Sequence, residues 1–390
     1  MVLVAGGTSA LLLCLTPQWA PASDAAVLGS GADTNGLDLI PERDALWSES
    51  MLWEKDVVVR FGLGYKDNIL LSPLAPQGSA FFLSGLDLTV LRLPMDGLDF
   101  NFSVTGDDTR YWKAPDGVKG EDLWLARAQL QKYFANEWRA GMEAKYIYAD
   151  QVLEELVVTG GLHAVQARGS TVSVRPFVRR DLGSNSWLQL EAPVTREWWQ
   201  SPLDPDWKSG LQLILGCSYG FHSELSLTCG GFYIAHADWL ARDAAGNELP
   251  GRTLDLWRQV FEFKWEHVWD ARQRWCSTTK GGLQSDQDNG GGYFDYDRYF
   301  ASEELRYRAA GWEIKAGAGV SYYDFLVQTL GTPPSPTLNL VTLNFSFRAE
   351  RQLYKSVRGF AAYEHEQAIS NDPESEYRAE TVTAGLSLEF

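Results

Sequence analysis

The sequence predicts an all-β fold: a closed, antiparallel transmembrane β-barrel of about sixteen strands, with fourteen or eighteen as the neighbouring even-numbered alternatives. Three observations support this prediction. Segments that alternate between apolar and polar residues recur along the 390 residues, the links between them are alternately short and long, and an uncharged apolar segment opens the chain. Because strand side chains point alternately to opposite faces, the alternation indicates that one face meets hydrocarbon and the other a polar space.

The chain opens with a segment typical of export. Residues 1–22 carry no charge and contain an apolar run at 10–15, followed by Ala-Pro-Ala at 20–22. These are the apolar core and small-residue cleavage site of a secretory signal. Lipidation of Cys14 is disfavoured, because Leu13 stands where a small residue is expected. We therefore expect a signal peptide at 1–22, a periplasmic leader at 23–54 and the barrel at 55–390.

The composition indicates that, if the chain spans a membrane, it does so with strands and not with helices. No apolar run approaches the roughly 20 residues that a spanning helix requires, and the mean hydropathy is -0.23. The 16 Trp and 16 Tyr supply rings of the kind that barrels place at both lipid interfaces. A soluble β-sandwich would also show alternation, but it has no reason to sort its links by length.

The strands are assigned in order from the alternation. In the last of them, Val382, Leu386 and the terminal Phe390 share an apolar face, and Thr383 and Ser387 lie on the polar one. The sixteen segments are 55–66, 79–93, 97–107, 121–133, 138–149, 169–180, 186–197, 208–218, 223–236, 254–269, 272–282, 299–309, 312–326, 337–351, 355–369 and 377–390.

The links alternate in length along the whole chain. The short ones are 94–97, 135–137, 181–186, 221–224, 270–271, 310–311 and 352–355. The long ones are 67–78, 107–120, 150–168, 198–207, 237–253, 283–298, 327–336 and 370–376. Barrels of this kind have short periplasmic turns and long external loops, so both termini are expected in the periplasm.

The polar face of each strand is assigned to the lumen. On the segment 254–269, for example, Trp257 and Phe261 oppose Arg258 and Glu262. A charge on the lipid face would cost about 2 to 4 kcal/mol at the bilayer midplane. The predicted pore-lining residues are Arg60, Asp87, Asp99, Arg127, Arg139, Glu143, Lys145, Arg175, Arg179, Arg258, Glu262, Lys264, Glu266, Glu304, Arg306, Arg308, Arg348, Glu350 and Arg358.

Two interpretations of these charges are open. Arg127, Arg139 and Arg175 on three successive strands could form a basic wall that selects solutes, as charge rings do in pores. Alternatively, the charges pair and brace the wall. Their signs nearly cancel, so the net charge of -17 is assigned mainly to the leader and to loop acids such as Asp204 and Asp286. Such a distribution would repel nucleic acid.

Neither a metal site nor a cofactor is predicted. The mature chain has three cysteines, and Cys217 and Cys229 continue apolar faces, so a bridge between them is disfavoured. The segment 286–297 resembles a calcium loop in the spacing of its acids, but Gly290 occupies the fifth place, where an oxygen ligand is normal. We expect this segment to be a flexible, solvated loop, whose acids divalent cations could bridge to lipopolysaccharide phosphates.

We expect no enzymatic activity. A hydrolase site on the barrel wall would need a nucleophile, a base and an orienting group within reach of one another. His222 and Ser223 point to opposite faces of their strand. His267 shares an apolar face with Trp265 and Trp269, where an interfacial ring is the better interpretation.

Two segments resemble known families. The sequence Arg-Phe-Gly-Leu-Gly-Tyr-Lys-Asp-Asn at 60–68, with 69–73 and 78–82, resembles the opening hairpin of the putative β-barrel porin family labelled type 2, although Lys66 stands where an acid is more usual. The resemblance implies a porin-like outer-membrane protein, sometimes linked with extracellular polysaccharide systems, and transfers no catalytic residue. The final strand with Phe390 resembles the insertion signal of Gram-negative outer-membrane barrels, which implies the barrel-assembly machinery as partner.

The expected function is a passive, porin-like channel for small hydrophilic solutes, surrounded by outer-membrane lipid and lipopolysaccharide. The alternatives are a polysaccharide-export outlet with a periplasmic partner, and a structural or adhesive surface barrel whose lumen is plugged. The long link 150–168 is the segment expected to fold inward, because it contains the apolar residues Val152, Leu153, Leu156, Val157 and Val158.

Overall fold

The computed structural model describes residues 53–92, 97–113, 117–134, 137–157, 161–220, 222–330 and 336–390, with side chains omitted for 153–157 and 161–165. The predicted signal peptide, 1–22, and nearly all of the predicted leader, 23–54, lie outside these residues. No helix in the described part of the chain is long and apolar enough to cross a membrane.

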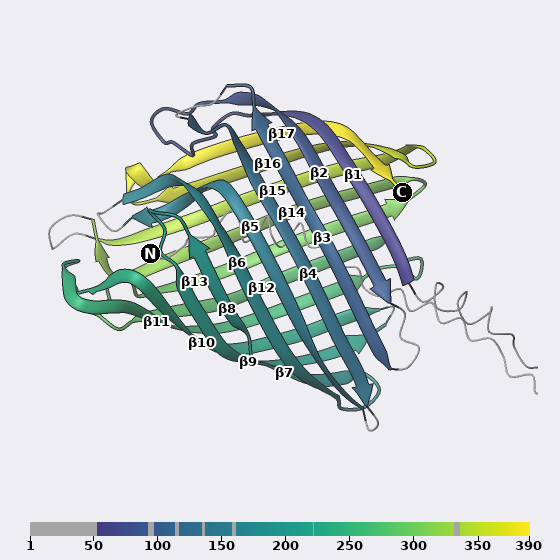
Figure 1. Cartoon of the computed structure of the whole chain (residues 1–390), viewed down its shortest axis with the longest axis horizontal. Coiled ribbons are helices and arrows are strands. Elements are labelled where there is room, and N and C mark those ends of the chain that lie inside the picture. The colour runs from purple at the N-terminus through teal and green to yellow at the C-terminus, as the bar shows by residue number, and fades with distance from the viewer. Residues whose placement is uncertain are drawn as a thin grey trace, which may run out of the picture.

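The described residues form one closed antiparallel sheet (Figure 1). The last strand pairs with the first, from Val58 opposite Glu389 to Lys66 opposite Thr381, which closes the barrel. The strands are β1 (Trp53–Lys66), β2 (Ser79–Arg92), β3 (Leu98–Tyr111), β4 (Gly120–Phe134), β5 (Trp138–Val157), β6 (Gly161–Asp181), β7 (Ser186–Glu191), β8 (Val194–Trp199), β9 (Asp206–Tyr219), β10 (Ser223–Arg242), β11 (Glu248–Val268), β12 (Trp275–Asp288), β13 (Tyr296–Ala309), β14 (Trp312–Thr329), β15 (Thr337–Tyr354), β16 (Val357–Ser370) and β17 (Tyr377–Glu389).

The wall contains sixteen strands, because β7 and β8 are two halves of one. Both pair with β6 on one side and β9 on the other. The interruption falls at Ala192 and Pro193, where proline has no amide hydrogen to donate to the ladder. The predicted all-β class and strand number are therefore confirmed.

Several links predicted to be long and irregular are instead extensions of the strands. The β5–β6 ladder continues to Val157 opposite Gly161, so most of 150–168 is a hairpin. The strands β10 and β11 likewise occupy most of 237–253. In both places consecutive apolar residues or glycines interrupt the alternation, so alternation alone does not reveal these parts of the strands. We call the end of the barrel with these long hairpins the loop end, and the opposite end the turn end.

The outward face matches the thickness of a bilayer. Trp257 of β11 and Trp269, the residue directly after β11, face outward and are 60% and 59% exposed. They are twelve residues apart, which corresponds to about 30 Å across the wall of a tilted strand. Between them Phe261 and Phe263 continue the same face. On this strand the outward face thus has an apolar band that is bordered by an aromatic side chain at each edge.

Glycines on the inner face accommodate rings from neighbouring strands. A Cβ added to Gly216 of β9 would overlap the indole of Trp187, and one added to Gly64 of β1 would overlap the ring of Phe81. The guanidinium of Arg179 covers the other side of the Trp187 ring, with its Cζ 4.0 Å from the ring centroid. The ring is therefore held flat against the wall.

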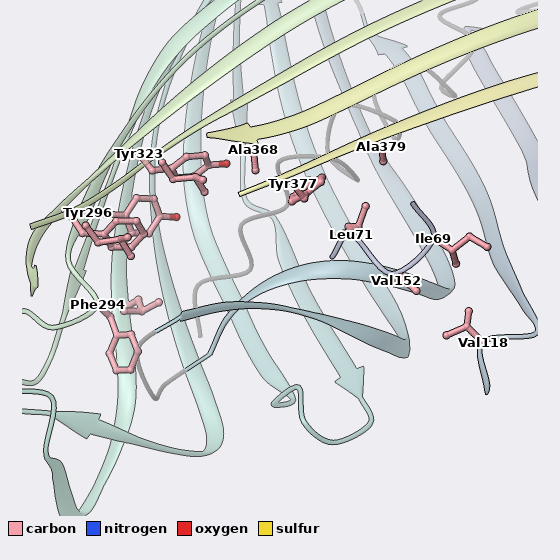
Figure 2. Packing of buried hydrophobic residues seen from close by; sticks show 14 of the residues in the cluster. Ile69, Leu71, Val118, Val152, Phe294, Tyr296, Tyr323, Ala368, Tyr377 and Ala379 are labelled. Carbon is pink, nitrogen blue, oxygen red and sulfur yellow. The ribbon is translucent and has the colours of Figure 1, made fainter. Parts of the chain in front are cut away.

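Buried apolar residues gather inside the loop end and form what we call the mouth cluster (Figure 2). Leu254 and Leu256 belong to it and share the inward face of β11 with Arg258. The inward face is therefore apolar near the loop end, which the sequence analysis did not predict. The cluster comprises Ile69, Leu71, Phe81, Tyr111, Val118, Val152, Ile234, Leu254, Leu256, Phe294, Tyr296, Tyr323, Phe325, Leu338, Leu340, Ala368, Tyr377 and Ala379.

Candidate functional site: the polar inner wall

The predicted basic wall on β4, β5 and β6 is interleaved with acids. Arg127 Nε donates to Glu143 Oε2 at 2.8 Å, and Arg175 lies 3.5 Å from Glu191. The register places Lys145 directly opposite Arg127, although like charges in that position repel each other. Lys145 makes no ion pair with any residue that the structure describes. Two arginines thus have acidic partners, whereas Lys145 has none among the described residues.

Nearer the turn end, two arginines share one carboxylate. Arg139 and Arg179 lie directly opposite each other on β5 and β6. Asp181 accepts from Arg139 Nη2 at 2.7 Å and from Arg179 Nε at 3.2 Å. The shared acid offsets the repulsion between the two cations. Arg139 therefore braces the wall, which favours the bracing interpretation for this residue.

On β1 to β3, one arginine joins two acids. The side chain of Arg60, which is only 9% exposed, pairs with Asp87 and with Asp107, the latter at 2.9 Å. Further toward the turn end, Asp99 accepts a hydrogen bond from Gln131 at 2.7 Å. The predicted residues of this sector are thus held by partners on neighbouring strands.

A buried ion pair joins β11 and β12. Arg258 Nε and Nη2 donate to the Asp286 carboxylate at 2.8 and 2.6 Å, and Gln284 donates to it at 3.2 Å. Asp286 is 0% exposed, so its assignment to a solvated loop was wrong. Its strand places it opposite Arg258, where the cation offsets the cost of burial. Nearby on β11, Lys264 pairs with Glu266 at 2.5 Å.

A second charged network lies at the turn end of β13 to β16. Glu313 accepts from Arg308 at 2.9 Å and lies 4.0 Å from Arg358. On the next strand, Arg348 Nε donates to Glu350 at 2.6 Å. These contacts couple adjacent strands, strands two apart across β15, or residues two apart on one face.

Three further predicted residues lie on the inner face without an ion-pair partner among the described residues. Glu262, Glu304 and Arg306 form no ion pair with any residue in the described part of the chain. The sequence analysis omitted other charges on the same faces. Lys280 is one example, since it lies directly opposite Lys264. A strict count of alternate positions from Cys276 onward would have found it. The omitted residues include Lys66, Glu121, Lys208 and Lys280.

Glu121 of β4 connects the wall to the base of the β5–β6 hairpin. Its carboxylate accepts from Lys66 Nζ at 3.2 Å, from the Tyr111 hydroxyl at 2.8 Å and from the backbone amide of Val152 at 3.3 Å. The β4–β5 ladder ends with Asp122 opposite Asp150. After Asp150, β5 has no further partner on β4. Glu121 therefore binds the first part of β5 that β4 leaves unpaired.

Both faces of the hairpin base are buried. Val152 belongs to the mouth cluster, on the same side as Ile69, Leu71 and Val118 (Figure 2). Ala167 is 0% exposed and packs with Leu203. The register sets Val152 opposite Gln166, so Val152 and Ala167 lie on opposite faces of the ribbon. The hairpin base is thus clamped in the mouth. The side chains of Leu153, Leu156, Val157 and Val158 lie outside the described residues.

The loop between β8 and β9 is attached to β10 through Asp204. This carboxylate accepts from the amides of Ala237, Asp238 and Trp239 and lies 3.3 Å from His236 Nδ1. Burial raises the pKa of Asp204, but the nearby His236 ring and the hydrogen bonds from the amides outweigh burial and hold the pKa below its ordinary value. Asp204 lies in a loop, as the sequence predicts, but it is buried there and caps these amides.

The loop that resembles a calcium site is fixed by internal hydrogen bonds. Asp288 accepts from the amides of Gly290, Gly292 and Phe294 at 2.8 to 2.9 Å. With Asp286 paired to Arg258, these oxygens have partners already. No group of His, Cys, Asp and Glu that could hold a metal ion occurs among the described residues.

Cys217, Cys229 and His267 occupy the outward face, whereas Cys276 lies opposite Arg306 on the inner face. Cys217 opposes Leu225 and Cys229 opposes Leu213, so the two thiols are in different rows and unbridged. The Nδ1 atom of His267 lies 3.3 Å from the hydroxyl of Ser223. Ser223 is 1% exposed and accepts from the Val268 amide, as a structural residue would. The absence of enzymatic activity stays a prediction.

Comparisons with known proteins give fold-level likeness alone. No family model and no curated protein matches the chain. A solved "bacterial polysaccharide outer membrane secretin" is 10% identical, with 86% of this chain and 98% of that one covered and a TM-score of 0.43. OccAB4 of Acinetobacter baumannii is 9% identical, with 86% and 98% covered and a TM-score of 0.47. OpdK of Pseudomonas aeruginosa is 9% identical, with 86% and 98% covered and a TM-score of 0.42. Values this low carry no functional inference.

Proposed function

We propose that the protein is an outer-membrane channel through which small hydrophilic solutes diffuse. The observation that carries the proposal is the state of the charges midway along the inner face. Arg127 and Arg175 keep 37% and 40% of their side chains exposed, and Glu364 of β16 is exposed as well. Charged side chains that stay accessible inside a closed wall indicate a water-filled lumen, whereas a packed interior would bury them.

The proposed orientation places the turn end in the periplasm. The N-terminal end of β1 and the C-terminus of the chain both lie at the turn end (Figure 1). The proposal includes export by the signal at 1–22 in a Gram-negative cell and insertion by the barrel-assembly machinery through Phe390. The residues of the opening hairpin support, by resemblance alone, a relation to the type 2 porin family.

The mouth cluster favours a second candidate, a structural barrel with a plugged lumen. Its members come from both sides of the barrel, including Phe81 of β2 and Tyr323 of β14. In the channel proposal, the clamped hairpin narrows the mouth without sealing it. In the plugged candidate, the same packing stops all passage. A polysaccharide outlet would need a wider mouth, and its partner is not part of this proposal.

Single-channel recording distinguishes the two candidates. The mature protein would be placed in a planar bilayer with a salt gradient, so that conductance and reversal potential are read in one trace. Steady stepwise currents are expected from the channel. A correctly folded barrel that passes no current would contradict the channel and support the plugged barrel. The reversal potential reports whether the unpaired cations or the unpaired acids dominate the lumen.

A further inference from the structure

An arginine occupies an unusual place on the lipid-facing side of the barrel. Arg196 lies on β8 between Val194 and Trp198 on the outward face, whose side chains are 44% and 46% exposed. On the adjacent strand it faces Trp207, which is 53% exposed. All of these residues lie near the loop end, at the level of the aromatic side chains that border the apolar band there. A cation at this depth sits where hydrocarbon gives way to lipid headgroups.

Arg196 has stacking partners but no anionic partner. Its Cζ lies 5.8 Å from the ring centroid of Trp198 and 5.2 Å from that of Trp207. It makes no hydrogen bond or ion pair with any residue that the structure describes. Two indoles fix the orientation of the guanidinium plane, and its N–H donors are left for a ligand. Planar guanidinium donors suit the bidentate recognition of phosphate.

Further polar groups face outward on the neighbouring strands, closer to the loops. Arg168 of β6 has a side chain that is 55% exposed, and its Nε donates to the Tyr148 hydroxyl at 3.2 Å. Ser170 lies between the two arginines in the register, opposite Trp198, with its hydroxyl 3.1 Å from that of Tyr146. The patch thus offers a second cation and several hydroxyl donors.

The acids nearby leave Arg196 uncompensated. Asp150 lies 3.7 Å from Arg168 and reduces the charge of that residue. Asp122 lies opposite Asp150, one strand further from Arg196. Glu197 and Asp206 adjoin the patch in sequence, but their side chains belong to the inner face, where Glu197 accepts from Trp199. Among the described residues of this patch, Arg196 is therefore the cation that lacks a neutralising partner.

We propose that Arg196, supported by Arg168 and the hydroxyl groups of β5 and β6, binds a phosphate group of an outer-leaflet glycolipid. The occupant follows from charge and location: the ligand is anionic, its headgroup lies at the ring of aromatic residues, and its acyl chains lie along the apolar band below. The proposal rests on the orientation in the proposed function, which exposes the loop end to the outer leaflet.

Diphosphorylated lipid A is the probe, and native mass spectrometry of the detergent-solubilised protein is the measurement. The wild type is expected to retain lipid A and to bind its dephosphorylated form more weakly. R196Q is expected to lower lipid A affinity about tenfold, which corresponds to the loss of one charge-assisted contact. R180Q is the matched control, because Arg180 stacks on Trp138 at the turn end, 5.3 Å from its ring centroid.

Three results would overturn the proposal: equal lipid A affinity for R196Q and the wild type, equal binding of dephosphorylated lipid A, or a preference for phosphatidylglycerol over lipid A. Heat-modified mobility on gels would verify that each variant is a folded barrel. The conductance of R196Q is expected to equal that of the wild type, because Arg196 faces lipid. Loss of the lipid site and failure of the channel are therefore separate outcomes.

Discussion

The ion pair of Arg258 and Asp286 offers the sharpest test of the inner wall. Asp286 is 0% exposed and accepts hydrogen bonds from Nε and Nη2 of Arg258 and from Gln284. Replacing it with leucine leaves the Arg258 guanidinium, 20% exposed, without its carboxylate. Removal of one partner of a buried pair costs about 3 to 5 kcal/mol. Because Arg258 keeps some exposure, we expect about 3 kcal/mol.

Urea unfolding of the barrel in lipid vesicles would measure this cost. The double variant R258M/D286L removes both charges and is expected to lose only about 0 to 1 kcal/mol, since apolar side chains of similar volume can replace a buried pair. The exposed pair of Arg274 and Asp270 is the control, and its loss should cost far less than the loss of Asp286, because solvent screens an exposed pair. If D286L and the double variant unfold alike, the reasoning about an uncompensated buried cation is wrong.

Four other outcomes are expected. E121A removes the acceptor of the hairpin base and should raise the open fraction of single channels about tenfold, since a charged hydrogen bond contributes about 1.5 to 3 kcal/mol; an unchanged trace would contradict the clamp. G216A should lower the free energy of unfolding in urea by about 1 to 3 kcal/mol, because its added methyl overlaps the Trp187 ring. G231A should be nearly neutral, because its added methyl meets open space. In the folded protein the pKa of Asp204 lies below the ordinary pKa of an aspartate. The stability that Asp204 contributes is therefore fully present when the pH is above the ordinary pKa, and it is lost as the pH falls through the lowered pKa of the folded protein. D204N should therefore weaken the acid dependence of unfolding, measured between about pH 5 and 2. K145Q should shift the reversal potential toward cation selectivity, and an identical potential would show that Lys145 does not contact the ion path.

The strands could be predicted because lipid and water impose opposite demands on adjacent residues. On β11, Phe261 and Glu262 differ in polarity because the first meets hydrocarbon and the second the lumen. Beyond the membrane this constraint ends. The β5–β6 hairpin there contains Glu154 and Glu155 in succession, and its alternation disappears although the ladder continues.

The contacts of the inner wall depend on register, which alternation does not specify. The pairing of Arg60 with Asp107 joins residues 47 apart in sequence and requires the alignment of three strands. Alternation also does not distinguish an inward face that meets water from one that meets packed side chains. For that reason Leu256 and Arg258 have the same predicted face, although one lies in the mouth cluster and the other in an ion pair.

Closure of β17 on β1 makes the barrel dependent on its last strand. The closing contacts include the bond from the Glu380 amide to Asp67, which joins residues 313 apart in sequence. A chain that stops before β17 would leave two unpaired strand edges in hydrocarbon, where each unsatisfied backbone group costs several kcal/mol. Stable closure of the barrel therefore acts as a test of complete translation, because a copy that lacks β17 cannot pair the two edges of its sheet.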